Sequence, residues 1–320
     1  MGYFGLQSII FYGILCTGLT EKTKLSFMSS NSSFTECVRK HDIVTVSSSF
    51  LANSNCDGPT YLSCTFTQVN LTSLYTSATF TSCVWTNCQS QNGGGIYLNV
   101  TSSSVTLSLN QSEFYSCTSS HRGGGIFVEG IGQLQVQYSL FHACVAGAAA
   151  DYGGGGIEIH DGGRPLIQET SFLSCQSGSD GAGMGIWSSP FYHEACVLNS
   201  RFVGCHAAPF GNDNDGGSLI VWDAIAAICC SNILFVDSLS EYRGGASSYY
   251  IYSSAGHHSS IHLFIFCFFK NNVARFRPGN DVYFHNWKPD QPFLHCFSLT
   301  PTDRIYPNGK DDNWLPHGTS

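Results

Sequence analysis

Residues 114–126, FYSCTSSHRGGGI, contain both of the short motifs that decide the fold of this chain of 320 residues. The first motif is F-x-x-C, here Phe114 with Cys117, and the second is a glycine cluster followed by an aliphatic residue, here ending at Ile126. Both motifs recur in alternation along the sequence. Self-similarity at a period of roughly 20 to 50 residues is typical of solenoids and other repeat proteins.

The F-x-x-C motif has five copies with a cysteine and two later copies in which another residue replaces the cysteine. From copy to copy the phenylalanines are 34, 27, 31, 30, 33 and 33 residues apart. If every copy occupies the same place in a repeat, the chain has a phenylalanine column that consists of Phe80, Phe114, Phe141, Phe172, Phe202, Phe235 and Phe268. It also has a cysteine column that consists of Cys83, Cys117, Cys144, Cys175 and Cys205.

The glycine clusters lie between these copies and are followed by the aliphatic residues Ile96, Ile126, Ile157, Ile186 and Leu219. A glycine cluster directly before a strand suits a corner at which the backbone takes a positive φ or closely approaches its neighbour. Between the motifs apolar and polar residues alternate, as in VTLSL at residues 105–109, and this alternation is the period of a β-strand. We therefore expect each aliphatic residue to begin an inward-facing row of side chains.

Together these features predict a right-handed parallel β-helix. One repeat of about 30 residues forms two or three short strands and cannot bury its own inner face, whereas stacked repeats share a continuous core. Parallel crossover connections are nearly always right-handed. We expect an all-β solenoid of about seven or more coils, with N- and C-terminal caps that shield the ends of the core.

The motifs divide the chain into four segments. Residues 1–19 are predicted to be a signal peptide, because residues 6–19 form an apolar stretch too short to cross a bilayer. Residues 20–79 have strand-like runs without clear glycine clusters and are predicted to form the N-terminal cap and first coils. Residues 80–284 hold the repeats, and residues 285–320, which are rich in Pro, Asp, Asn and Trp, are predicted to form a C-terminal cap or irregular tail.

The alternation of G-G-[AIVL] with F-x-x-N motifs resembles the repeat of the polymorphic outer membrane protein family. The predicted coil resembles the wider pectin-lyase-like superfamily of right-handed β-helices. The likeness covers residues 80–284, and five copies carry Cys where that family usually has Asn. This resemblance implies a secreted or cell-surface β-helix, often associated with adhesion.

The low content of charged residues and the negative net charge limit the kinds of partner that this chain is expected to bind. The chain has 14 Lys and Arg against 22 Asp and Glu, a formal net charge of −8, and only 11% of its residues are charged. Nucleic-acid binding is excluded as a prediction, because neutralising phosphates requires a dense basic face. The most apolar internal run, residues 261–269, contains a histidine and suits a buried strand rather than a membrane span.

Four N-x-[ST] sequons follow the predicted signal peptide, and we expect them to be candidate glycosylation sites: Asn31, Asn70, Asn99 and Asn110. Each triplet is individually a weak signal in a chain rich in Ser and Thr. They agree, however, with the apolar N-terminus. We expect the protein to be extracellular or displayed at the cell surface.

The fifteen cysteines allow three interpretations. Those of the F-x-x-C motif are core-facing free thiols if they serve as small apolar residues. Alternatively, equivalent residues of adjacent coils lie within bridging distance, and an oxidising compartment would join some of them as disulfides. Metal ligation, from Cys83 with Cys88 or from Cys229-Cys230 with His257-His258, is the weakest interpretation because no pair has zinc-site spacing. We predict no metal and no cofactor.

Many β-helix proteins act on polysaccharides, and such enzymes need clustered carboxylates on neighbouring coils. The acidic spots at residues 213–215 and 310–312 lie in Gly- and Asn-containing segments and are more simply solvated loops. His160-Asp161 follows a repeat strand but has no partner acid or nucleophile in the sequence pattern. We therefore predict no catalytic residues.

The sequence thus predicts a non-catalytic adhesion or structural interaction module. Long flat faces and the loops at residues 146–150 and 209–215 would contact a surface protein or a glycan. The alternative is a degenerate or unrecognised polysaccharide-active β-helix. No motif specifies the partner or the oligomeric state.

Overall fold

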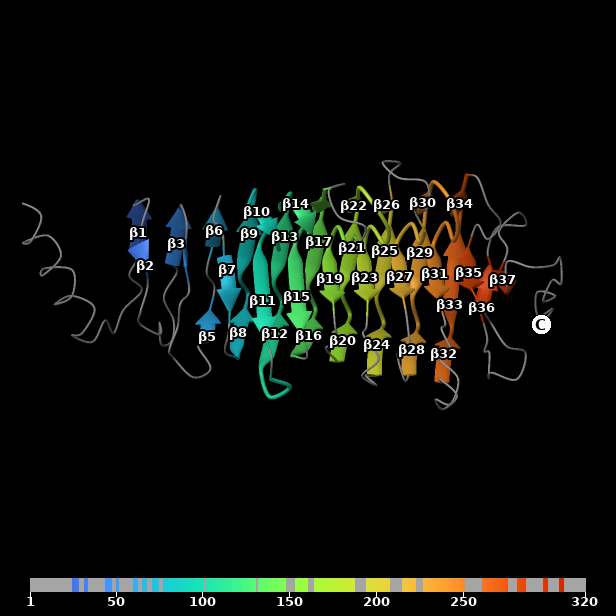
Figure 1. The fold of residues 1–320 in the computed structure, drawn as a ribbon, viewed down its shortest axis with the longest axis horizontal. Helices are drawn as coiled ribbons and strands as arrows, with labels where there is room; N and C mark the ends of the chain where they lie inside the picture. Colours follow the sequence, from blue (N-terminus) through green and yellow to red (C-terminus); the bar gives the residue numbers. More distant parts are fainter. Residues whose placement is uncertain are drawn as a thin grey trace, which may run out of the picture.

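The computed structural model describes the repeat region and short strands on either side of it, namely residues 25–28, 32–33, 44–47, 50–51, 60–62, 65–67, 71–74, 77–100, 102–130, 132–147, 153–160, 164–187, 194–207, 215–222, 227–250, 261–275, 281–285, 296–298 and 305–307. Within these residues the chain is an all-β parallel solenoid with no helix (Figure 1). The solenoid has about five turns, and its strands form four long sheets. The prediction of a parallel β-solenoid is confirmed.

Sheet 1 has eleven strands, and every copy of the phenylalanine motif from Phe114 to Phe268 begins in it. Its strands are mostly three residues long, and neighbouring strands pair in parallel, as β13 does with β17 and β21 with β25. They are β1 (Leu25–Met28), β3 (Val44–Ser47), β6 (Thr65–Thr67), β9 (Val84–Thr86), β13 (Glu113–Tyr115), β17 (Leu140–His142), β21 (Ser171–Leu173), β25 (Arg201–Val203), β29 (Leu234–Val236), β33 (Cys267–Lys270) and β36 (Cys296–Ser298).

Sheet 2 has seven strands and follows sheet 1 within each coil. They are β10 (Gln89–Asn92), β14 (Thr118–Arg122), β18 (Val145–Ala146), β22 (Gln176–Ser177), β26 (His206–Ala207), β30 (Leu239–Ser240) and β34 (Val273–Ala274).

Sheet 3 has nine strands and follows the glycine clusters. They are β7 (Leu71–Leu74), β11 (Ile96–Val100), β15 (Ile126–Gly130), β19 (Ile157–His160), β23 (Met184–Trp187), β27 (Leu219–Trp222), β31 (Ser247–Tyr250), β35 (Val282–His285) and β37 (Ile305–Pro307).

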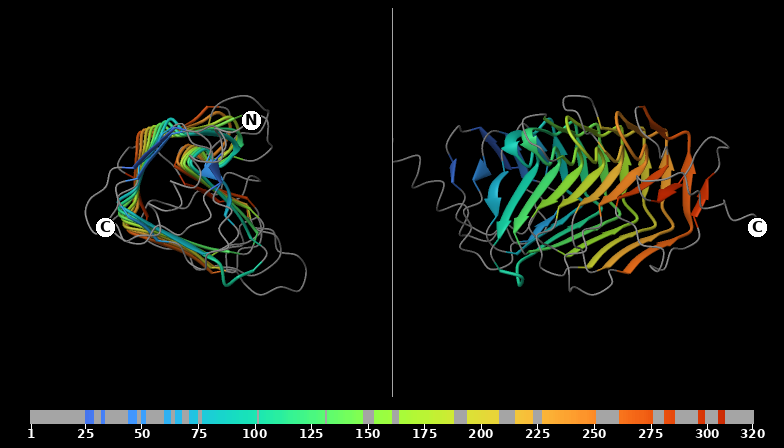
Figure 2. Two further views of the ribbon diagram at one scale, coloured as in Figure 1. Left: turned by 90° about the vertical axis from the view of Figure 1, so that its left-hand side faces the viewer. Right: turned by 45° about the vertical axis from the view of Figure 1, so that its right-hand side comes forward.

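Sheet 4 has eight strands and leads into the next strand of sheet 1. They are β5 (Thr60–Leu62), β8 (Ala78–Thr81), β12 (Thr106–Asn110), β16 (Gln133–Gln137), β20 (Arg164–Gln168), β24 (Glu194–Leu198), β28 (Ala227–Ser231) and β32 (Ile261–Ile265). A separate pair consists of β2 (Ser32–Ser33) and β4 (Phe50–Leu51). Viewed along the axis, the coils superimpose as an open ring of sheets (Figure 2).

Two of the corners in each coil are made by a single left-handed residue. Between sheets 4 and 1 this residue has φ near +50° in successive coils, for example Gln111 at 51° and Asn199 at 48°. Between sheets 1 and 2 the third residue of the F-x-x-C motif takes the same conformation, as Ser116 does at 51°. An isolated left-handed residue shifts the side-chain alternation by one position at the corner, so that the residue before it, such as Tyr115, points outward and the residue after it, such as Cys117, is buried.

The glycine clusters form the corner that leads into sheet 3. A Cβ on Gly124 would lie 2.3 Å from the carbonyl oxygen of Gly155 in the next coil, which no side-chain movement can relieve. Only glycine therefore permits this approach. One copy has a different register from the predicted one, because Met184, not Ile186, pairs with Ile157. The cluster in that coil is consequently Gly181-Ala182-Gly183.

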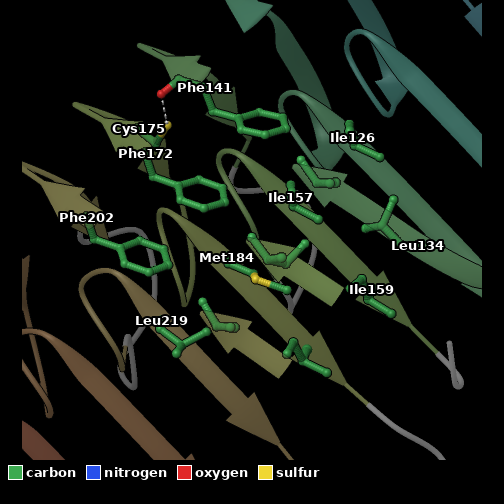
Figure 3. Packing of buried hydrophobic residues seen from close by; sticks show 14 of the residues in the cluster. Ile126, Leu134, Phe141, Ile157, Ile159, Phe172, Cys175, Met184, Phe202 and Leu219 are labelled. Carbon is green, nitrogen blue, oxygen red and sulfur yellow. Dashed lines mark hydrogen bonds between the residues drawn. The ribbon is translucent and has the colours of Figure 1, made fainter. Parts of the chain in front are cut away.

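A stack of aromatic rings forms the centre of the core, as Figure 3 shows for Phe141, Phe172 and Phe202. Ring centroids of neighbouring coils lie 4.6–5.1 Å apart from Phe114 to Phe269, and the ring planes are within 9° of parallel. Offset stacking at this separation is favourable beyond the burial of each ring. The described stack consists of Phe66, Trp85, Phe114, Phe141, Phe172, Phe202, Phe235 and Phe269.

The predicted phenylalanine column was wrong at both ends. Phe80 is buried but belongs to sheet 4, where it pairs with Leu109, and Trp85 occupies its predicted place. Phe268 faces outward, and its neighbour Phe269 stacks on Phe235. In both cases two aromatic residues lie close together in sequence, so that residue spacing alone could not choose the inward-facing one.

The cysteine column is displaced in the same way at its start. Cys83 follows the corner between sheets 4 and 1, and its backbone N–H donates to the hydroxyl of Ser112, the residue at the equivalent place in the next coil. Cys88 follows Trp85 by three residues and precedes Cys117 in the column. All members are buried thiols, and the column consists of Cys88, Cys117, Cys144, Cys175 and Cys205.

Candidate functional site

The outer face of sheet 1 carries apolar side chains that are not packed in the hydrophobic core. The middle residue of each short strand points inward, so that the flanking residues point outward. Many of these are aliphatic or aromatic, and they are half-buried apart from Leu234, which is 36% exposed. We define the outer strip as Val84, Tyr115, Leu140, Leu173, Val203, Leu234, Val236 and Phe268.

Part of the outer strip forms an unbroken row because the register is regular, whereas Val84, Tyr115 and Leu140 pair with the polar residues Glu113, His142 and Ser171. Leu173 in β21 pairs directly with Val203 in β25, and Val203 pairs with Val236 in β29. Equivalent residues of neighbouring strands lie about 4.7–4.9 Å apart, so their side chains are in contact along the solenoid. A contiguous apolar surface of this kind marks an interaction site more often than scattered apolar residues do.

Charged and polar groups are interspersed with the outer strip. The Tyr115 hydroxyl donates to Oε2 of Glu113 at 2.9 Å, and this hydrogen bond raises the pKa of Tyr115. Farther along, Nε of Arg201 donates to the hydroxyl of Ser171 at 2.8 Å. Lys270 is exposed beside Phe269. An apolar strip with interspersed polar groups matches the composition of protein interfaces.

A second group of polar and charged side chains lies on the outer face of sheet 3, together with Arg122 from β14 of sheet 2. We call it the charged cluster: Tyr97, Asn99, Arg122, Glu129 and Glu158. Glu129 accepts hydrogen bonds from the Tyr97 hydroxyl and, at 3.1 Å, from Nδ2 of Asn99. Glu129 is in β15 and Glu158 in β19, so that two carboxyl groups lie on neighbouring coils. Sequence reasoning missed this cluster because its members are not adjacent in sequence.

Glu158 is the buried member of the charged cluster and has no exposed surface. Its Oε2 accepts a hydrogen bond of 3.1 Å from the backbone N–H of Gly123, and its Oε1 lies 3.8 Å from Nε of Arg122. Burial raises the pKa of Glu158 to about 8, against the lowering effects of Arg122 and the Gly123 hydrogen bond. The carboxyl group is therefore mainly protonated at neutral pH and holds a glycine corner in place.

A small aromatic core accompanies these groups farther along sheet 3. Trp187 and Tyr250 are each 4% exposed, and the rings of Trp222 and Tyr250 stack at 3.9 Å. Arg243 donates to the Tyr250 hydroxyl at 3.0 Å and lies 3.5 Å from Oδ2 of Asp215. Because these side chains are mostly buried, they stabilise the outer face of sheet 3 rather than form an open binding platform.

Two of the four sequons, Asn31 and Asn70, lie outside the described residues. Asn99 and Asn110 are half-buried in β11 and β12. His160 is half-buried at the end of β19, whereas Asp161, residues 213–214, residues 310–312 and His257-His258 fall outside the described part. Residues 1–19 also lie outside it.

The part of the chain that the structure describes contains no cluster of three or more His, Cys, Asp or Glu side chains able to hold a metal ion. The same residues include no helix that is long and apolar enough to span a membrane. In comparisons with known proteins, no family model, no curated protein and no solved structure matches this chain.

Proposed function

We propose that this chain is a non-catalytic interaction module, secreted or displayed at the cell surface, that binds a partner through the outer strip of sheet 1. The fold would be a right-handed, capped β-helix of the pectin-lyase-like kind, related in its repeat to polymorphic outer membrane proteins. The resemblance of the repeat motifs and the apolar N-terminus support this proposal.

The outer strip is the observation that carries the proposal. Apolar side chains contribute roughly 25 cal/mol for each Å² removed from water, so a row of half-buried aliphatic residues gains by being covered. The strip favours a protein partner over a glycan, because its members are mainly Leu and Val rather than exposed aromatic rings. Glycans are usually held by aromatic stacking and hydrogen bonds.

The alternative is a polysaccharide-active β-helix, and the pair Glu129 and Glu158 favours it. Glycoside hydrolases use two carboxyl groups, one of them kept protonated by a raised pKa. Glu158 meets that second condition. A general acid must, however, reach the substrate. Glu158 has no exposed surface, and its carboxyl group already accepts a hydrogen bond from Gly123 and lies beside Arg122. The non-catalytic proposal accounts better for this burial.

A cell-binding assay with matched variants tests the proposed function. The double variant Leu173→Glu with Val203→Glu places two charges in the outer strip, and we expect binding of the labelled protein to fall at least about tenfold. The control Ser108→Glu with Gln135→Glu places two charges at directly paired, half-buried positions on the outer face of sheet 4. We expect the control to bind like the unmodified protein.

Two further measurements separate the alternatives. Treating the cells with protease should abolish binding if the partner is a protein, whereas glycosidase treatment should abolish it if the partner is a glycan. Release of reducing or unsaturated sugars from a polysaccharide panel, lost in Glu158→Gln, would overturn the non-catalytic proposal. Equal binding by the strip variant and its control would show that the outer strip is not the interface.

A further inference from the structure

Two cysteines outside the core column occupy neighbouring coils of sheet 4. Cys196 in β24 and Cys229 in β28 are direct partners in the parallel register. Their neighbours Val197 and Cys230 are fully buried, whereas Cys196 and Cys229 are only partly buried. Because side chains alternate across a strand, both thiols project from the outer face of the same sheet. Both residues are reduced in the structure.

This arrangement meets the requirements of a disulfide. Directly paired residues of adjacent strands have Cα atoms about 4.7–4.9 Å apart, within the range of roughly 4.4–6.8 Å that a disulfide spans. Access to solvent allows an oxidant to reach either sulfur. We propose that Cys196 and Cys229 form a redox site, at which an intramolecular disulfide joins two coils. The site does not depend on the partner proposed above.

A small-molecule disulfide such as oxidised glutathione supplies the oxidising equivalents. The thiolate of one cysteine attacks a sulfur of oxidised glutathione, which forms a mixed disulfide and releases one glutathione thiolate. The second cysteine then attacks the protein sulfur of the mixed disulfide and releases the other glutathione. Overall two protein thiols are oxidised to one disulfide, one oxidised glutathione is reduced to two glutathiones, and each glutathione takes one proton.

The core cysteine column provides an internal comparison. Cys144 and Cys175 also occupy equivalent places in neighbouring coils, but neither has exposed surface. The Cys175 thiol donates to the backbone carbonyl of Phe141 at 3.5 Å, as Figure 3 shows. Burial raises the pKa of Cys144 and of Cys205, and because no thiol of the column has exposed surface, oxidised glutathione cannot reach them. The core thiols should therefore stay reduced under conditions that oxidise the outer pair.

The test is a mass-spectrometric map of the folded protein after equilibration with oxidised glutathione, followed by alkylation under denaturing conditions. We expect one linked peptide pair that contains Cys196 and Cys229, a loss of two hydrogen atoms, and alkylated core cysteines. The disulfide should raise the melting midpoint by roughly 2–8 °C relative to the reduced protein. Treatment with a reductant should reverse both changes.

Three variants sharpen this test. Cys196→Ser should leave Cys229 with one bound glutathione, and Cys229→Ser should leave Cys196 in the same state, because the resolving thiol is absent. The control Cys144→Ser should retain the linked pair. The proposal is overturned if Cys196 and Cys229 are both alkylated, if each carries its own glutathione, or if either is joined to another cysteine.

Discussion

At the scale of single residues, Glu158 makes the stability of this protein depend on pH. Its pKa is about 8 in the folded chain against an ordinary value of 4.5. Since the folded state holds the proton more tightly, this contribution to stability is fully present below pH 4.5, falls as the pH rises, and is lost above pH 8. The difference corresponds to about 5 kcal/mol in the free energy of unfolding.

We therefore predict that Glu158→Gln removes most of this pH dependence. Glutamine has the same shape and can still accept the N–H of Gly123, but it does not ionise. Denaturant unfolding between pH 4.5 and 9 should show that the variant gains stability relative to the unmodified protein as the pH rises. Glu169→Gln, at an exposed corner position, is the control and should not change the pH profile. Parallel profiles for Glu158→Gln and the unmodified protein would contradict the assignment.

Sequence patterns could not have identified Glu158. It follows Ile157 and precedes Ile159 in a strand whose alternation predicts an outward-facing residue, and its side chain does lie on the outer face of sheet 3. Its burial arises from Arg122 and the glycine corner of the preceding coil, which are about 35 residues away in sequence. Only the stacking of coils brings these groups together.

At the scale of elements, the stacked rings distinguish inward-facing from outward-facing phenylalanines. Phe141 is fully buried between Phe114 and Phe172, whereas Phe268 is half-buried on the outer strip. We predict that Phe141→Ala lowers the free energy of unfolding by about 3–5 kcal/mol. Phe268→Ala should cost no more than about 1–2 kcal/mol, because less apolar area is lost. Chemical denaturation of both variants checks this order, and equal losses would contradict the placement.

The repeat motifs predicted the elements better than they predicted the register. Alternation and glycine clusters were sufficient to predict parallel strands, because both reflect local backbone requirements. Whether Phe80 or Trp85, or Phe268 or Phe269, joins the ring stack depends on where the left-handed corner residue lies. The stacked ring is the third residue after that corner. Ser82 and Phe266 have positive φ values of 54° and 53° without being glycine, so composition gave no sign of these corners.

At the scale of the whole molecule, the solenoid restricts each coil to contacts with its two neighbours. Stability in such an array is approximately the sum of coil terms and nearest-neighbour interface terms. The fold could be predicted from sequence for this reason, because one repeated unit specifies the rest. The outward-facing residues do not repeat from coil to coil. Glu113, Leu140 and Ser171, for example, occupy the same position in three successive coils. The motifs therefore could not predict the candidate interface.

Nearest-neighbour coupling predicts how far the effect of a substitution travels along the solenoid. The rings of Phe141 and Phe172 stack at 5.1 Å, whereas Phe235 is separated from Phe141 by two intervening rings. In double-mutant cycles with Phe→Leu substitutions, we expect Phe141 and Phe172 to couple by about 0.5–1.5 kcal/mol. Phe141 and Phe235 should be additive within about 0.3–0.5 kcal/mol. Leucine keeps most of the buried area, so that all variants stay folded for denaturant titration. Equal coupling for the near and distant pairs would mean that packing strain spreads through the whole stack, and the stability of the solenoid would then not be a sum over adjacent coils.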